Sequence, residues 1–66
     1  MNIKDMSNNL KICVLAEYFG GMDAFKEKMG ASKHVIPKWR KNGLPASQAI
    51  KIEKLSNGEF KAVDLV

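Results

Sequence analysis

The chain has 66 residues, and a chain of this length forms one small domain that buries only about 60% of its unfolded surface on folding. Its formal net charge of +4 at pH 7 favours an anionic partner without identifying one. One cysteine excludes an intrachain disulfide, and one cysteine with one histidine is too small a ligand set for a structural metal. The composition therefore predicts a marginally stable domain with no cross-link, in which Cys13 is a small buried hydrophobic residue.

The first eight residues are polar and indicate a mobile segment that precedes one domain over residues 9–66. This segment does not have the character of a signal peptide. The apolar run after it is too short and too charged to span a membrane. We therefore expect a cytoplasmic protein.

The first helix is expected from Asn8 or Asn9, either of which can cap it, to Phe19. Four apolar residues have the spacing of one buried stripe on this helix: Leu10, Val14, Leu15 and Tyr18. Gly20 and Gly21 then end it, because glycine adopts the left-handed backbone that a helix C-terminus needs.

A second, shorter helix is expected over about residues 22–29. Met22, Phe25 and Met29 lie on one face of it, and Asp23 in the first turn complements the helix dipole. Gly30 ends this helix and permits a sharp reversal of the chain.

A third helix is expected over residues 32–41, with Ser32 as its N-cap. Val35, Ile36 and Trp39 fall within one arc of this helix and predict its buried face. The side opposite this arc carries Lys33, His34, Pro37 and Lys41, with Lys38 and Arg40 on its flanks.

The remainder contains one more helix and an ambiguous tail. Pro45 suits the first turn of a helix that extends to about Ser56, with Ala49, Ile52 and Leu55 spaced by three. Residues 59–66 fit either a short helical turn or an edge strand that pairs in a dimer. No other segment alternates with a period of two, so the sequence predicts an all-α fold, a compact domain of four to five helices.

Two short helices joined by a glycine turn, the second with a basic outer side, are the pattern of a helix-turn-helix. Residues 30–43 contain four basic residues and no acidic one: Lys33, Lys38, Arg40 and Lys41. In such a motif the second helix enters the major groove, where lysine and histidine side chains can reach base edges. Taken alone, a basic helix face is more often merely solvated; the combination with the glycine turn and the apolar stripe favours DNA.

From Ala16 to Leu65 the chain resembles the small phage Cro-type repressors and the related prophage antitoxin-type regulators. The matching segments are YFGG at 18–21, MGASKHVIPKW at 29–39, NGLP at 42–45, AIKIE at 49–53 and NGEFKAVDL at 57–65. The resemblance implies a repressor of transcription that binds a short double-stranded DNA operator as a weak or DNA-induced homodimer. By position it implies contacts to bases from Lys33, His34, Pro37 and Lys38.

The remaining roles in the motif divide between phosphate contacts and packing. We expect phosphate contacts from Lys26, Arg40, Lys41 and Asn42. The packed residues of the motif are Phe25, Met29, Gly30, Val35, Ile36 and Trp39.

The chain departs from the resemblance at two positions. Lys26 stands where this motif usually has a small alanine, so its stem is expected to lie along apolar surface while its ammonium reaches solvent or phosphate. Pro37 stands where a polar residue is common, and its ring crowds the carbonyl of Lys33, at a cost of about 3 kcal/mol in a helix interior. We therefore expect the third helix to be bent or loosened in its first turn.

No set of catalytic residues is evident, and we expect no enzyme activity, cofactor, small-molecule ligand or membrane partner. The alternative function is that of an antitoxin or inhibitor acting by protein–protein interaction, with Phe60, Val63, Leu65 and Val66 as the candidate apolar patch. Glu53 is either a solvated carboxylate or a partner for a basic residue or the Trp39 indole.

Overall fold

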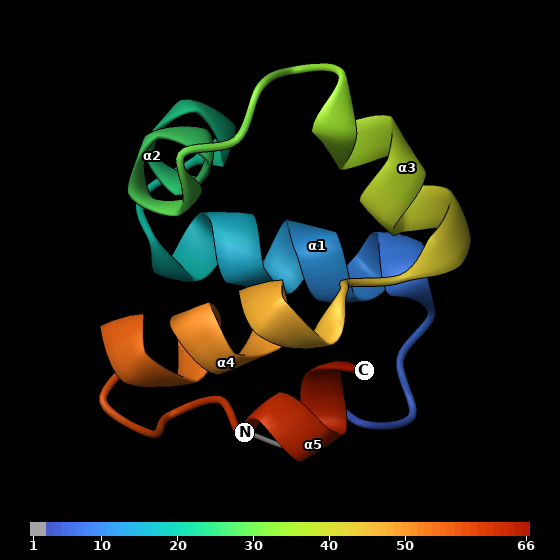
Figure 1. Cartoon of the computed structure of the whole chain (residues 1–66), viewed down its shortest axis with the longest axis vertical. Helices are drawn as coiled ribbons and strands as arrows, with labels where there is room; N and C mark the ends of the chain where they lie inside the picture. The colour runs from blue at the N-terminus through green and yellow to red at the C-terminus, as the bar shows by residue number, and fades with distance from the viewer. Residues whose placement is uncertain (1–2) are drawn as a thin grey trace.

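Five α-helices form the regular structure of residues 3–66, the part of the chain that the computed structural model describes. They are α1 (Asn8–Tyr18), α2 (Met22–Met29), α3 (Val35–Asn42), α4 (Ala46–Leu55) and α5 (Ala62–Leu65). In Figure 1, α1 crosses the middle of the molecule, with α2 and α3 on one side and α4 and α5 on the other. No strand occurs within residues 3–66, so the all-α prediction is confirmed, and the tail forms the short helix α5.

The core takes side chains from all five helices and from the segment before α1. Its most deeply buried large residues are Ile3, Ile12, Leu15, Phe25, Ile52, Phe60 and Leu65. The sequence placed residues 1–8 outside the packed domain, but Ile3 is only 1% exposed and Met6 packs against the core. The packed part therefore extends to residue 3 at least; residues 1–2 lie outside the described part.

Helix α1 occurs where it was expected, but its cap and its buried face differ from the prediction. Ser7 is the N-cap, and its hydroxyl oxygen accepts a hydrogen bond from the N–H of Leu10. The buried residues are Lys11, Ile12, Leu15 and Ala16. Leu10 and Tyr18 are each 48% exposed, so the predicted stripe was wrong in two of its four members. Apolar residues occur around most of α1, and packing against α2 and α3 determines which of them are buried.

Cys13 is exposed on α1, and the prediction of a buried cysteine was wrong. It lies on α1 next to Ile12, which is buried, and its own side chain faces away from the core. The apolar neighbours of Cys13 in the sequence therefore gave no guide to its burial.

Helix α2 ends as the sequence indicates. Gly30 has φ +64° and ψ +29°, the left-handed conformation. Its N–H donates to the carbonyl of Glu27, and the N–H of Ala31 donates to the carbonyl of Lys26. This pair of bonds is the Schellman motif, which satisfies two of the carbonyls left without intrahelical donors.

Helix α3 starts at Val35, three residues later than predicted, so Ser32 is not its N-cap and Lys33 and His34 lie in the preceding turn. The later start explains how Pro37 is accommodated. Pro37 is the third residue of α3, and the first four N–H groups of a helix have no intrahelical acceptor. The proline therefore removes no helical hydrogen bond, and its fixed φ suits the first turn.

The C-terminal part is held by a left-handed turn after α4. Asn57 and Gly58 both have positive φ, and the N–H of Gly58 donates to the carbonyl of Glu53. Ala49 and Ile52 are fully buried, as the spacing predicted, but Leu55 is 43% exposed because the helix ends there. No helix within residues 3–66 is long and apolar enough to cross a membrane.

Candidate nucleic-acid interface

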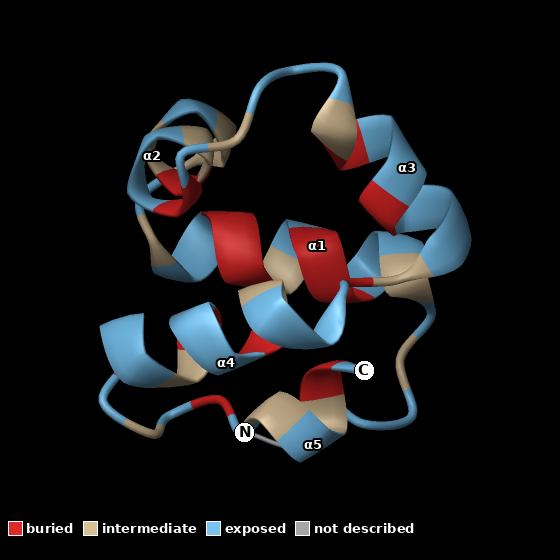
Figure 2. Cartoon of the chain, in the orientation of Figure 1, coloured by how far each residue is buried: buried red, intermediate tan, exposed pale blue. Residues whose placement is uncertain are grey.

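The four residues proposed to reach bases are all exposed, and they lie on two consecutive segments. Lys33 and His34 belong to the turn before α3, whereas Pro37 and Lys38 lie in the first half of the helix. The buried residues of α3 are on the side facing α1, and most of its remaining surface is exposed (Figure 2). The four side chains are therefore available to a partner in the free protein.

Three of the four proposed phosphate contacts lie together in the last turn of α3. Arg40, Lys41 and Asn42 are all exposed there. Positive side chains at this end also complement the negative end of the helix dipole. The helix dipole alone therefore accounts for part of the positive charge of Arg40 and Lys41, and their exposure leaves them accessible to a phosphate.

Lys26, the fourth proposed phosphate contact, lies on α2 and differs from the others. Its side chain is 26% exposed, and its ammonium is 3.4 Å from a carboxylate oxygen of Asp23. The stem is thus largely covered, as expected for a long side chain in place of alanine. A surface ion pair of this kind contributes about 0–1 kcal/mol, so a phosphate can compete for the ammonium.

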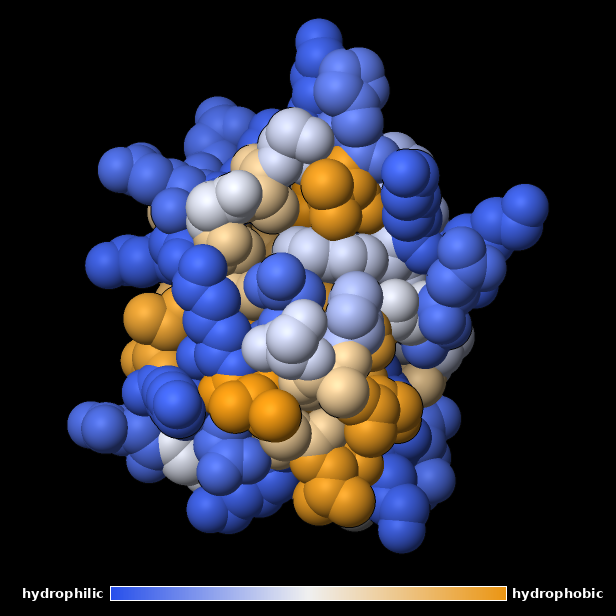
Figure 3. Space-filling model, in the orientation of Figure 1, coloured by the Kyte–Doolittle hydropathy of each residue, from blue (hydrophilic) through white to orange (hydrophobic). Residues whose placement is uncertain are grey.

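Negative charge is absent from a long central part of the sequence. Residues 28–52 contain no aspartate or glutamate, and their basic residues are Lys28, Lys33, Lys38, Arg40, Lys41 and Lys51. In Figure 3, long hydrophilic side chains stand out around the whole outline of this face, and hydrophobic surface lies both between α2 and α3 and over α4 and α5. The turn and α3 therefore present positive charge that no acidic residue of the same segment offsets.

The opposite side of α3 is fixed to the core. Ile36 and Trp39 are each 5% exposed, and Val35 packs against the core at its edge. At the far end, Gly43 has φ +90°, and a Cβ there would come within 3.3 Å of the side-chain oxygen of Asn8 at the start of α1. Of the residues predicted to pack in the motif, Phe25, Met29, Ile36 and Trp39 are buried and Val35 is half-buried, whereas Gly30 is exposed.

Lys51 is a contributor to this region that the sequence did not reveal. Its ammonium donates a 2.9 Å hydrogen bond to the carbonyl oxygen of Met29, at the end of α2. The two residues are 22 positions apart, and no local pattern connects them. The only sequence signal for this contact is that a lysine occurs on α4, the helix that follows α2 and α3.

Glu53 also has a definite role, which is different from those considered from the sequence. Its carboxylate accepts a 2.7 Å hydrogen bond from the N–H of Ala62, the first residue of α5. Ser56 acts similarly, because its hydroxyl oxygen accepts from the N–H of Phe60. These two side chains of the α4 end fix the tail against the domain and place Phe60 in the core.

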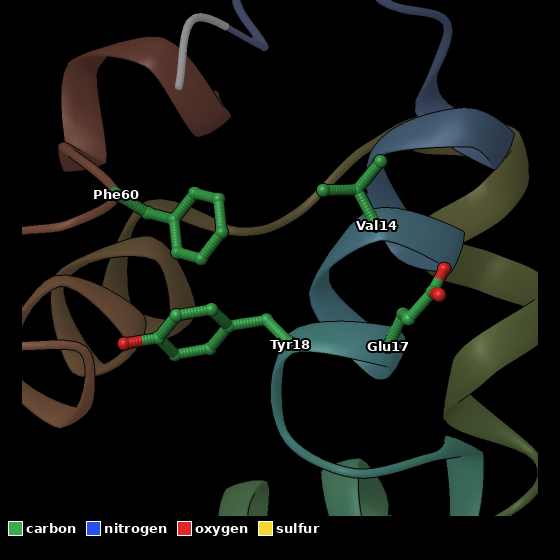
Figure 4. A pocket seen from close by; sticks show the side chains of 4 residues that line it. All are labelled: Val14, Glu17, Tyr18 and Phe60. Carbon is green, nitrogen blue, oxygen red and sulfur yellow. The ribbon is translucent and has the colours of Figure 1, made fainter.

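A second surface lies on the other side of the molecule. A hollow of about 350 Å³ is lined by Val14, Glu17, Tyr18 and Phe60 (Figure 4). The rings of Tyr18 and Phe60 meet edge to face, with centroids 4.9 Å apart. Of the tail residues proposed as an apolar patch, Val63 and Val66 are 75% and 63% exposed, whereas Phe60 and Leu65 are buried and belong to the core.

Comparison with known proteins gave no match: no family model, curated protein or solved structure is significantly similar to this chain.

Proposed function

We propose that the protein is a sequence-specific, double-stranded DNA-binding repressor of transcription. The observation that carries this proposal is the exposed basic face of α3 and its preceding turn, on a helix whose other side is fixed in the core. A basic outer face alone is also found on solvated helices, and the proposal therefore depends on its combination with the glycine turn before α3 and the packed apolar stripe. The resemblance to Cro-type repressors supports the same function.

In the proposed complex α3 enters the major groove, which is wide enough to admit one helix. Lys33 and Lys38 donate to guanine O6 and N7, and His34 donates to or accepts from a base edge. Pro37 offers an apolar contact, for example to a thymine methyl group. Arg40, Lys41 and Asn42 bind phosphates, as does Lys26 when it leaves Asp23, and these contacts supply affinity without sequence information.

On an operator with two half-sites, the dimensions of the domain would require two copies. Its principal extents are 25, 23 and 20 Å, whereas half-sites one helical turn apart are separated by about 34–36 Å. One copy therefore cannot read both halves of a palindrome. We propose a weak or DNA-induced homodimer, acting in the cytoplasm of a bacterial host at the nucleoid.

Selection of bound sites from random double-stranded DNA, followed by titration at two salt concentrations, tests the proposal. A palindromic site is expected, with affinity that falls with salt at a log–log slope of about −0.9 per phosphate contact. Equal and weak binding to every sequence would contradict specific repression.

A second candidate function, an antitoxin-like module that binds another protein, is favoured by the exposure of Val63 and Val66. Deleting the tail would not test it cleanly, because Phe60 and Leu65 are part of the core. The double change Val63→Ser and Val66→Ser alters the surface alone. Unchanged DNA binding and unchanged self-association in that variant would show that Val63 and Val66 contribute neither to DNA binding nor to a homodimer.

A further inference from the structure

The contact between Lys51 and Met29 joins α4 to the point where α2 ends and the turn begins. The Lys51 ammonium lies 2.9 Å from the carbonyl oxygen of Met29. A Cβ built on Gly30 would lie 3.8 Å from the same ammonium nitrogen. Lys51 is exposed as a residue, yet its charged end lies over the start of the turn. A surface lysine that is held in one place has lost side-chain entropy, so the contact has to offset that cost.

The unsatisfied carbonyl of Met29 explains what offsets the side-chain entropy that Lys51 loses. The Schellman bonds from Gly30 and Ala31 satisfy the carbonyls of Glu27 and Lys26, but they leave the carbonyl of Met29 without a backbone donor. The ammonium of Lys51 supplies that donor and places a positive charge at the negative end of the α2 dipole. Hydrogen bonds of this charge-assisted kind are stronger than neutral ones.

The position of this contact relates it to the proposed DNA interface. The chain between Gly30 and α3 is exposed at Ser32, Lys33 and His34, and the core packing of this segment is limited to the half-buried Ala31. Within the exposed part, the N–H of Val35 donates to the carbonyl of Ser32, and the path of the turn otherwise depends on its two ends, which are Gly30 with Ala31 and the start of α3. Lys51 holds the first of these ends.

We propose that Lys51 is a positioning residue for DNA recognition: by holding the end of α2 it fixes the path of the turn that presents Lys33 and His34. This inference rests on the proposed DNA-binding function. Lys51 acts here through the turn and does not itself touch DNA. The competing role is a direct phosphate contact, since an ammonium has three donors and only one is used by Met29.

Three variants separate these roles. Lys51→Met removes the donor and the charge while retaining an apolar stem, and Lys51→Arg retains a donor. Lys54→Met is the matched control, because Lys54 is an exposed lysine on the same helix and its removal changes the net charge equally. Each is titrated with the selected operator over a range of salt concentrations, and its unfolding in urea is measured.

If Lys51 positions the turn, Lys51→Met should bind the operator about tenfold more weakly than Lys54→Met, with the same dependence of affinity on salt. Lys51→Arg should then recover most of the affinity. A slope reduced by about 0.9 in Lys51→Met would identify a direct phosphate contact and overturn the inference. Equal affinity of Lys51→Met and Lys54→Met would overturn it as well.

A measurement on the free protein decides the inference even if specific DNA binding fails. Amide NMR spectra of Lys51→Met should show shifted resonances at residues 30–34 and faster hydrogen exchange at Gly30 and Ala31, whose amides are hydrogen-bonded, and those of Lys54→Met should not. Unchanged amides at residues 30–34 would show that Lys51 does not hold the turn. Absence of specific DNA binding by the unmodified protein, with the expected NMR changes, would reject the proposed function and leave Lys51 as a positioning residue of the turn alone.

Discussion

The ring of Phe25 meets the indole of Trp39 at 71°, with the ring centroids 6.3 Å apart. Phe25 comes from α2 and Trp39 from α3, so this contact joins the two helices of the candidate motif, each of which also packs against α1. Both side chains are at most 5% exposed. Aromatic pairs in this edge-to-face arrangement contribute about 0.5–1.5 kcal/mol beyond the burial of their area.

The Phe25 contact can be tested by a conservative truncation. Phe25→Leu loses the ring contact and leaves a small cavity, so we expect a loss of about 1–2 kcal/mol in the free energy of unfolding. Unfolding in urea, followed by the fluorescence of the single tryptophan, measures it. Val63→Ala is the control, since Val63 is 75% exposed and its truncation should change stability by no more than about 0.5 kcal/mol. Equal stability of the two variants would contradict the packing of Phe25.

Pro37 should be neutral or mildly stabilising where it stands. Because it lies in the first turn of α3 it removes no helical bond, and it restricts the unfolded chain. We expect Pro37→Ala to lower the free energy of unfolding by about 0.4–1 kcal/mol, and Arg40→Pro, further along the same helix, to lower it by about 3 kcal/mol. Thermal unfolding followed by circular dichroism compares them. A large gain of stability in Pro37→Ala would show that the proline strains the helix.

The tail should depend on Glu53 more than on any other acidic side chain near it. Removing the carboxylate in Glu53→Ala leaves the N–H of Ala62 without its acceptor, at a cost of about 0.5–2 kcal/mol, the range for a lost helix cap. Hydrogen exchange of the Ala62 amide, measured by NMR, should become faster. Glu53→Gln retains an acceptor oxygen and should recover part of the protection, while the exposed Glu59 serves as the control in Glu59→Ala. Full protection of the Ala62 amide in Glu53→Ala would exclude the contact.

The parts of the fold that follow from local chemistry could be predicted from the sequence. Helix α2 was predicted between Met22 and Met29, because glycines flank it and its apolar residues share one face. Gly30 was predicted as its end for the same reason. Both features depend on interactions within a few residues, which a single sequence displays.

The parts that failed depend on tertiary packing. Apolar residues occur around most of α1, so periodicity could not select Ile12 over Leu10 as the buried residue. The contacts of Lys51 and Glu53 join residues 22 and 9 positions apart, and neither follows from spacing. The start of α3 was misplaced because Ser32 is a good cap locally, whereas the constraint of Pro37 favours a later start.

Cys13 gives a direct test of the orientation of α1. Because the side chain is exposed, a thiol reagent should modify Cys13 in the folded protein without prior unfolding. Its rate in native buffer is expected to lie within about tenfold of the rate in urea. Cys13→Ser should change the free energy of unfolding by no more than about 0.5 kcal/mol. Modification that requires urea would show that α1 buries Cys13 instead.

The division between base and phosphate contacts predicts two kinds of DNA-binding variant. Lys38→Ala, or Lys33→Ala in the turn, should cost about 1–3 kcal/mol on the selected operator and relax the preference at one position, because a base-edge contact is lost. Arg40→Ala should weaken binding to all sequences alike and reduce the salt slope by about 0.9, because only a phosphate contact is lost. Pro37→Ser should change the preferred operator more than the overall affinity, since serine introduces a hydrogen-bonding group on the side proposed to face DNA. Binding to a library of single-base operator variants measures all four. If Lys33, Lys38 and Arg40 gave the same pattern, the assignment of bases to the turn and first half of α3 would be wrong.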